Sequence, residues 1–213
     1  MNTIYGFAMS PYTSRVILAC RAGDIPYELT PPPGGLKSDE FLPMSPFGKI
    51  PVYKDEEVTL CESVVILDYL DERYDVTASA KSSAATRAKS QLYVAYADLY
   101  LQPAISALFR LWVGGDRSKE TASELSKDVI KSLKVFDEDE HFTDRSLEVL
   151  SKADFCVAPA LTFMEQLYQR FELPNPLPEF TRVAQYWERL SSHPIVGGHL
   201  EVVNELLTKR LDG

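Results

Sequence analysis

The hydrophobic positions in the first third of the chain come in short runs that predict a small α/β unit. Residues 3–7 and 26–29 are expected to be strands, with a helix over residues 15–22 between them. The apolar face of that helix is formed by Val16, Ile17, Ala19 and Cys20. Gly23 is expected to end it. A strand–helix–strand unit of this kind is expected to be parallel and right-handed.

Further runs up to about residue 75 complete this unit. Pro51 is expected to open a strand, because a proline cannot donate a ladder hydrogen bond and stands where pairing begins. The polar residues 55–57 then form the tip of a hairpin. In order, we expect a short capped helix over residues 38–42, strands over 52–54 and 58–60, and a helix over 64–70. Residues 1–75 are therefore predicted to form an α/β domain with a mixed four-stranded sheet.

The rest of the chain has helical periodicity only. Residues 76–83 are small and polar and are expected to be a linker. A long helix over residues 84–112, bent near Pro103, is followed by helical patterns over 119–140, from Ser151 onward, and over 180–190 and 201–211. Ser151 and Asp154 have the spacing of a capping box. Residues 84–213 are predicted to form an all-helical domain.

Charge and composition narrow the possible partners. The formal net charge is −9, and the lysines and arginines are scattered, which argues against nucleic acid or an anionic membrane as a partner. No apolar run approaches the roughly 20 residues of a membrane span, and the first residues do not resemble a signal peptide, so we expect a cytoplasmic protein. Cys20, Cys61 and Cys156 are isolated and odd in number, which predicts reduced thiols and no metal site.

Two polar segments near residues 50 and 62 predict a binding edge. If the bond before Pro51 is cis, the turn would leave the N–H and C=O of Ile50 free to pair with an extended ligand. Glu62 and Ser63 open a helix, so a carboxylate, a hydroxyl and free backbone N–H groups meet at one corner that could hold a zwitterion. The alternative is that Ser63 is only an N-cap and Glu62 only a favourable charge beside it.

Ser10 stands where the first strand ends and the first helix begins. Cysteines at Ser10 and Thr13 would give the redox motif of a thioredoxin-like fold, but the hydroxyls found there exclude disulfide exchange at these positions. A serine hydrolase would need a histidine partner. His141, His193 and His199 all lie in the predicted helical half, and no nucleophile-elbow motif surrounds Ser10.

Several of these motifs occur together in a familiar order. They are Ser10 five residues before Arg15, the run 47–51, the pair Glu62-Ser63, the linker, and the box 151–154. In this order and spacing the chain resembles the soluble glutathione transferases over essentially its full length. The serine and its neighbours are most similar to phi and theta-like bacterial classes. The resemblance implies a thioredoxin-like N-terminal domain, an all-α C-terminal domain, and transfer of alkyl or aryl groups to the sulfur of glutathione, with no metal.

The resemblance also implies roles for individual residues. The Ser10 hydroxyl would point at the glutathione sulfur and stabilise its thiolate. The glutathione-binding set would be Glu62 and Ser63 at the γ-glutamyl end, the backbone of Ile50 beside a cis Pro51, and Lys37 and Lys49 at the glycyl carboxylate. Phe47 matches an aromatic residue that inserts into the partner subunit in several classes, so a homodimer is expected. Its alternative is ordinary core packing.

The second substrate is expected between Ser10 and the long helix, in an apolar pocket. Tyr12, Ile105 and Phe109 are the candidate lining residues, although a helical stripe of this kind is more often core or dimer contact. A hydrophobic electrophile would be attacked there by substitution, addition, or cleavage of an ether or halide. Two alternatives stay open: a glutathione-dependent isomerase or dehalogenase, and a non-catalytic ligand-binding protein on the same fold.

Overall fold

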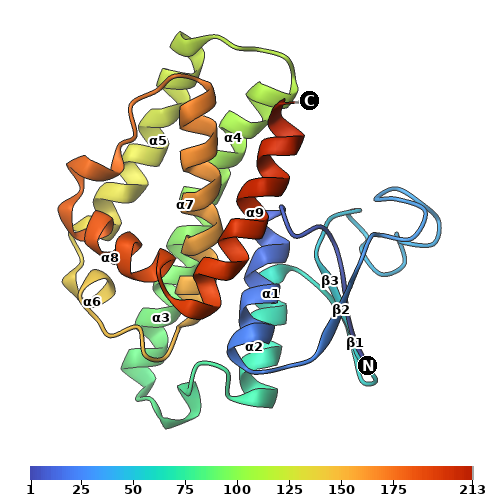
Figure 1. The fold of residues 1–213 in the computed structure, drawn as a ribbon. Helices are drawn as coiled ribbons and strands as arrows, with labels where there is room; N and C mark the ends of the chain where they lie inside the picture. Colours follow the sequence, from blue (N-terminus) through green and yellow to red (C-terminus); the bar gives the residue numbers. More distant parts are fainter. Residues whose placement is uncertain (213) are drawn as a thin grey trace.

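A four-stranded mixed sheet forms the N-terminal part of the chain (Figure 1). The structure is a computed structural model that describes residues 1–212. The strands are β1 (Asn2–Tyr5), β2 (Tyr27–Thr30), β3 (Val52–Lys54) and β4 (Thr59–Cys61). Their order is β2-β1-β3-β4, with β2 parallel to β1, β3 antiparallel to β1, and β4 antiparallel to β3. The predicted strand–helix–strand unit and hairpin are therefore confirmed, and each strand end lies within two residues of its predicted position.

Two helices belong to this part, α1 (Pro11–Ala22) and α2 (Ser63–Tyr74). Helix α1 begins four residues before the predicted start, because Ser10 caps it and Pro11 occupies its first turn, where a missing N–H costs nothing. The predicted helix over residues 38–42 is wrong. Single helical turns form there, such as Leu42 N–H to Ser38 C=O at 3.0 Å, but Pro43 prevents their continuation.

The C-terminal part is all-helical, as predicted. Its elements are η1 (Ser79–Lys81), α3 (Ala84–Tyr96), η2 (Ala97–Leu101), α4 (Gln102–Val113), α5 (Lys119–Asp137), α6 (Glu140–Thr143), α7 (Lys152–Arg170), η3 (Leu177–Glu179), α8 (Thr181–Ser191) and α9 (Pro194–Asp212). The predicted long helix is α3, η2 and α4 in succession. Its irregularity is η2, a π-helical turn that ends just before Pro103.

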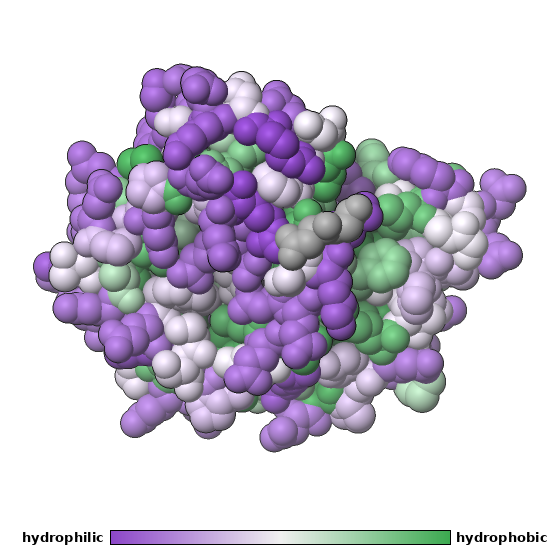
Figure 2. All heavy atoms as spheres, turned by 45° about the horizontal axis from the view of Figure 1, so that its top comes forward, coloured by the Kyte–Doolittle hydropathy of each residue, from purple (hydrophilic) through white to green (hydrophobic). Residues whose placement is uncertain are grey.

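One hydrophobic core connects the two parts. Helix α1 lies between the sheet and the helices, and it packs against α2, α7 and α9 (Figure 1). Its Val16 and Leu18 are fully buried in the same cluster as Leu161 of α7. On the outside, the face turned forward in Figure 2 is mostly hydrophilic, with hydrophobic residues showing between polar ones. The core therefore holds the sheet and the helical part together along α1.

The terminal helix α9 begins at Pro194, seven residues before the predicted start at residue 201. Gly197 and Gly198 weaken the helical pattern, which is why sequence analysis placed the start too late. The structure explains Gly197: a Cβ there would lie 2.8 Å from the carbonyl oxygen of Ser191, at the end of α8. A glycine therefore allows α9 to turn back directly after α8.

The start of α7 contains the predicted capping box. Ser151 Oγ accepts a hydrogen bond from the Asp154 N–H at 3.4 Å, and the Asp154 carboxylate accepts one from the Ser151 N–H at 2.6 Å. Asp154 is fully buried and also accepts a hydrogen bond from the Tyr186 hydroxyl at 2.5 Å and pairs with Arg145. The box is thus extended into a buried polar network joining α7 to α8.

His199 of α9 is buried against α1, and this predicts an acid-sensitive stability. Its Nε2 lies 2.9 Å from Ser14 Oγ, and the Ser14 hydroxyl donates to the Ala8 carbonyl at 2.7 Å. Burial, with a smaller contribution from Arg21, lowers the pKa of His199 to about 4. The unfolded chain, with a pKa of about 6.5, takes up the proton first, so this stabilisation is present above pH 6.5 and is lost as the pH falls toward 4.

We therefore expect the free energy of unfolding to drop by about 2 kcal/mol between pH 7 and pH 5 through His199 alone. Urea unfolding at both pH values measures this drop. In His199→Gln, whose side chain cannot titrate, the drop in the free energy of unfolding should be smaller by that amount. If the variant has the same pH dependence as the original protein, the assignment to His199 is wrong. His193→Gln, at a histidine outside the α1–α9 contact, is the matched control.

Candidate active site

A cavity of about 490 Å³ lies where the sheet meets the long helix. Its lining from the N-terminal part is Ser10, Tyr12, Leu36, Ser45, Gly48, Lys49, Ile50, Pro51, Cys61, Glu62, Ser63 and Val64. Its lining from the helical part is Asp98, Pro103, Ser106 and Arg110. The structure thus brings together all the glutathione-binding candidates except Lys37, whose Nζ donates to the Phe47 carbonyl at 3.2 Å instead.

Ser10 is the N-cap of α1 and is half-buried at the cavity wall. Its Oγ accepts a hydrogen bond from the Thr13 N–H at 3.4 Å, which fixes the hydroxyl at the positive end of the helix. Within residues 1–212 the hydroxyl donates to no other group. Its proton is therefore available to an anion in the cavity.

The loop before β3 forms a second wall. Ser45 is buried and holds Lys49 through both backbone groups, donating to its carbonyl at 2.7 Å and accepting from its N–H at 2.9 Å. Gly48 has a φ of 59°, and a Cβ there would lie 2.5 Å from the Leu36 carbonyl oxygen, so only glycine fits. The Ile50–Pro51 bond is cis. Ile50 stands two residues before the first paired residue of β3, outside the ladder.

The corner at residues 62 and 63 differs from a simple helix cap. Glu62 occupies the cap position with φ 68° and ψ 109°, and its side chain makes no capping hydrogen bond. Ser63 is the first helical residue, so its interpretation as the N-cap is wrong. Instead its Oγ accepts a hydrogen bond from Arg15 Nη1 at 3.3 Å. A positive φ is costly for a non-glycine residue and is typical of functional sites, where it aims a side chain.

A buried ion pair between Arg15 and Asp98 contacts Ser63 at this corner. Arg15 of α1 is fully buried, and its Nη1 lies 2.5 Å from Asp98 Oδ1. Asp98 comes from the π-helical turn η2 and lines the cavity. Sequence analysis missed Asp98. The sequence does show a single carboxylate within an apolar helical stretch. Its pairing with the buried Arg15 can be recognised only when the two helices are packed together.

The side of the cavity away from the sheet is more polar than predicted. Ile105 is fully buried, and Phe109 packs against Phe163 with ring centroids 5.1 Å apart; neither lines the cavity. Apolar residues of α4 face the core, where burial is most favourable. Tyr12 does line the cavity, and burial raises the pKa of its hydroxyl, so it is protonated at neutral pH. Opposite it stand Pro103, Ser106 and Arg110.

Residues 1–212 contain no group of three or more histidines, cysteines or carboxylates placed to hold a metal ion. In the same part of the chain, no helix is both long and apolar enough to cross a membrane. The polar side chains of the cavity lining include several hydroxyls, the charged groups of Lys49 and Glu62, Asp98 of the buried ion pair, and Arg110 of α4.

Comparison with known proteins bears on this site. Residues 4–80 match the family model described as the glutathione S-transferase N-terminal domain. The chain is 26% identical over 203 residues to glutathione S-transferase 4 of Zea mays, covering 90% of this chain and 88% of that protein. It is also 26% identical over 189 residues to a probable chloroplastic glutathione S-transferase of rice, DHAR2, covering 85% of this chain and 62% of that protein.

Solved structures share the fold over nearly the whole chain. Glutathione transferase F7 of Populus trichocarpa superimposes with a TM-score of 0.81 at 22% identity, covering 96% of this chain and 100% of that one. Apo human glutathione S-transferase T1-1 gives a TM-score of 0.82 at 22% identity, covering 100% and 92%. The fold is thus a thioredoxin-like domain followed by a helical domain, with a cavity where they meet. Residues 4–80 thus match the glutathione S-transferase N-terminal domain, and the chain as a whole shares the fold of the glutathione transferases.

Proposed function

We propose that this protein activates glutathione as a thiolate on Ser10 and transfers it to an electrophile. The observation that carries the proposal is a hydroxyl with an available proton at a helix N-terminus, in the same cavity as the residues of the binding edge. Lowering a thiol pKa from about 8.5 to about 6.5 requires roughly 2.7 kcal/mol of preference for the thiolate. A hydrogen bond to a charged group supplies about 1.5–3 kcal/mol, and the helix end adds less than about 1.

Glutathione would lie along the wall made by residues 48–63. Glu62 would bind the γ-glutamyl ammonium, and Ser63 with the N-terminus of α2 would bind the carboxylate beside it. The Ile50 backbone would pair with the cysteinyl unit as a short added strand. Lys49 would meet the glycyl carboxylate, joined by Lys37 if it leaves the Phe47 carbonyl. In this proposal residues 1–75 bind glutathione, and residues 84–213 complete the cavity on the acceptor side.

The test is a pH titration of the thiolate ultraviolet absorbance of glutathione bound to the purified protein. A bound thiol pKa well below that of free glutathione is the expected result. Saturable binding with an unshifted pKa would contradict thiolate activation and favour a non-catalytic binding protein. Failure to bind glutathione at all would overturn the assignment of the site.

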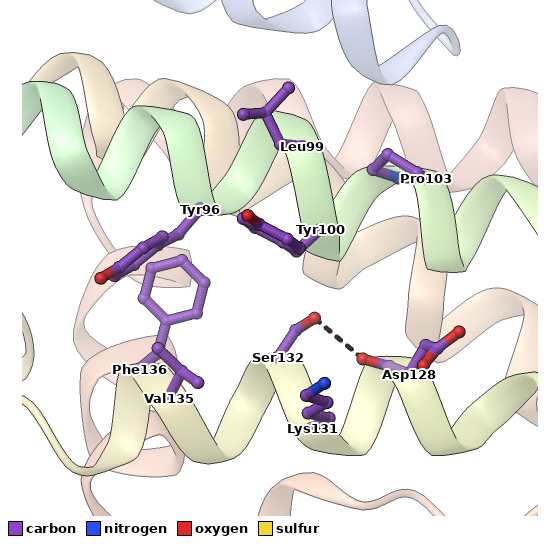
Figure 3. Close-up of a pocket in the computed structure, with 9 residues that line it drawn as sticks. All are labelled: Tyr96, Leu99, Tyr100, Pro103, Asp128, Lys131, Ser132, Val135 and Phe136. Carbon is purple, nitrogen blue, oxygen red and sulfur yellow. Dashed lines mark hydrogen bonds between the residues drawn. The ribbon is translucent and has the colours of Figure 1, made fainter.

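We also propose that the protein is a homodimer in which Phe47 enters a groove on its partner. Phe47 is 70% exposed, so the alternative of core packing is wrong. A groove of about 440 Å³ runs between the long helix and α5 (Figure 3). Tyr96 points from the long helix toward Phe136 of α5 in this view, with ring centroids 6.2 Å apart, and Tyr100 lies beside Tyr96.

The groove is mostly apolar, with Asp128, Lys131 and Ser132 of α5 among its lining residues, and it remains exposed in a single chain. Leu99, Tyr100 and Val135 at its walls are 63%, 61% and 41% exposed. One phenylalanine side chain buried from each subunit gains about 1.5–3 kcal/mol, and two-fold symmetry doubles this contribution. An exposed aromatic side chain and an exposed apolar groove on the same molecule are thus complementary, and a second copy would cover both.

Phe47→Glu is expected to convert the dimer to a monomer, because the groove would have to bury a carboxylate. Light scattering should give twice the 24.0 kDa chain mass for the original protein and 24.0 kDa for the variant. Val202→Glu on α9, at another exposed apolar residue, is the control and should stay dimeric. A dimeric Phe47→Glu variant would exclude this contact.

We place the protein in the cytoplasm and closest to the phi and theta-like classes. Cys20, Cys61 and Cys156 are free, which fits a reducing compartment. The plant relatives and the T1-1 structure support the assignment to these classes.

A further inference from the structure

Every charged side chain at the cavity except one has a partner or a proposed role in binding glutathione. Arg15 and Asp98 neutralise each other. Lys49 and Glu62 line the glutathione-binding wall. The remaining charge is the guanidinium of Arg110, in the last turn of α4. Arg110 is exposed, and within residues 1–212 it forms neither an ion pair nor a hydrogen bond with another residue.

Two hydroxyl groups accompany this arginine. Ser106 lies one helical turn before Arg110 on the same face of α4, and both line the cavity. Tyr12 of α1 lines the same cavity, where burial raises the pKa of its hydroxyl while Ser106 and the charge of Arg110 act to lower that pKa. Ser106 Oγ accepts a hydrogen bond from Gln102 Nε2 at 3.2 Å, which leaves its own proton available. The acceptor side thus presents a cation and two hydroxyl donors.

We propose that the electrophile carries a carboxylate or similar planar oxyanion, which Arg110 binds with the Ser106 and Tyr12 hydroxyls. This inference rests on the proposed function and names the substrate class for it. A guanidinium fork matches the two oxygens of a carboxylate. With a net charge of −9, the protein repels anions in general, so a local cation is required to admit one. In an aryl halide acceptor, the thiolate forms the S–C bond, the halide leaves with its electron pair, and the oxyanion is unchanged.

The inference can be tested without turnover, using two non-reactive glutathione conjugates. S-benzylglutathione and S-(4-carboxybenzyl)glutathione differ only in the ring carboxylate. Binding is measured by calorimetry for the original protein, Arg110→Gln, Arg110→Lys and the control Arg182→Gln. Arg182 is a partly exposed arginine on α8, paired with Glu140 and outside the cavity lining.

The original protein is expected to bind the carboxybenzyl conjugate about tenfold more tightly than the benzyl one, the strength of one charge-assisted contact. Arg110→Gln should remove this preference and leave the affinities for S-benzylglutathione and free glutathione within about twofold. Arg110→Lys should retain part of it, and Arg182→Gln all of it.

Two other outcomes would overturn the inference. If Arg110→Gln weakens the binding of free glutathione as much as the binding of the conjugates, Arg110 is a glutathione ligand. If the original protein shows no preference between the conjugates, the acceptor is not selected by an oxyanion. Neither result affects the thiolate titration, which decides the proposed function separately.

Discussion

Replacing Ser10 with alanine is expected to raise the pKa of bound glutathione by about 1–2 units, because the thiolate loses a hydrogen bond worth about 1.5–3 kcal/mol. The thiolate fraction at pH 7, and with it the rate of conjugation, should fall about 3- to 25-fold from that at a bound pKa of about 6.5. The affinity for glutathione should stay nearly the same. The rate should recover toward that of the original protein as the pH rises above the new pKa.

Ser10 also caps α1, so the two roles must be separated. Loss of the cap in Ser10→Ala costs about 1 kcal/mol of stability, whereas a glycine cap costs only a few tenths. Ser10→Gly should therefore lose thiolate activation while keeping stability. Ser106→Ala removes a different hydroxyl from the same cavity and should leave the thiol pKa unchanged. An unaltered pKa in both Ser10 variants would remove Ser10 from the mechanism.

Asp154→Ala is expected to lower the free energy of unfolding by about 3–5 kcal/mol, the cost of breaking a buried charge network. The substitution removes the acidic half of the capping box at the start of α7. It also leaves the Tyr186 hydroxyl buried without its acceptor and the Arg145 guanidinium, with only 22% of its side chain exposed, without its anion. Both groups lower the stability of the variant, because they are held inside the protein where little water can replace the lost partner.

Denaturant unfolding measures this effect. Asp154→Asn keeps the shape of the side chain and one acceptor oxygen. Its free energy of unfolding should lie between those of the original protein and Asp154→Ala. Glu120→Ala removes an exposed acidic residue from the first turn of α5 and should change stability by less than about 0.5 kcal/mol. A loss below about 1 kcal/mol for Asp154→Ala would show that the network contributes little to stability.

Most of the fold could be predicted from local sequence signals. The strands around Ile4 and Tyr53 are short buried runs with clear ends, and the helix containing Val16 has a clear apolar face although it begins four residues earlier than expected. The capping box at Ser151 and Asp154 has a fixed spacing. The helix expected over residues 38–42 does not form, because Pro43 cannot continue it. Helix α9 begins earlier than expected, because a tight contact with α8 requires Gly197, which weakens the helical pattern.

The candidate site divides in the same way. Ser10, Lys49, Ile50, Pro51, Glu62 and Ser63 follow one another along connected motifs, and they share a cavity because the sheet order brings β1, β3 and β4 together. Asp98 and the polar face of α4 depend on how a distant helix is rotated. Periodicity alone cannot fix that rotation across an irregular turn. The sequence therefore predicts Ile105 and Phe109 as lining residues, whereas Ser106 and Arg110 line the cavity.

That irregular turn, η2, holds one residue more than a regular α-helix would place in the same length. It lets α3 and α4 each keep an apolar face toward the core while Asp98 reaches Arg15. A deletion of a single codon within residues 97–101 could therefore leave both helices packed and still remove the counter-charge of a buried arginine. In the evolution of this architecture, a change of chain length at one turn can alter the electrostatics of the site as strongly as a substitution inside it.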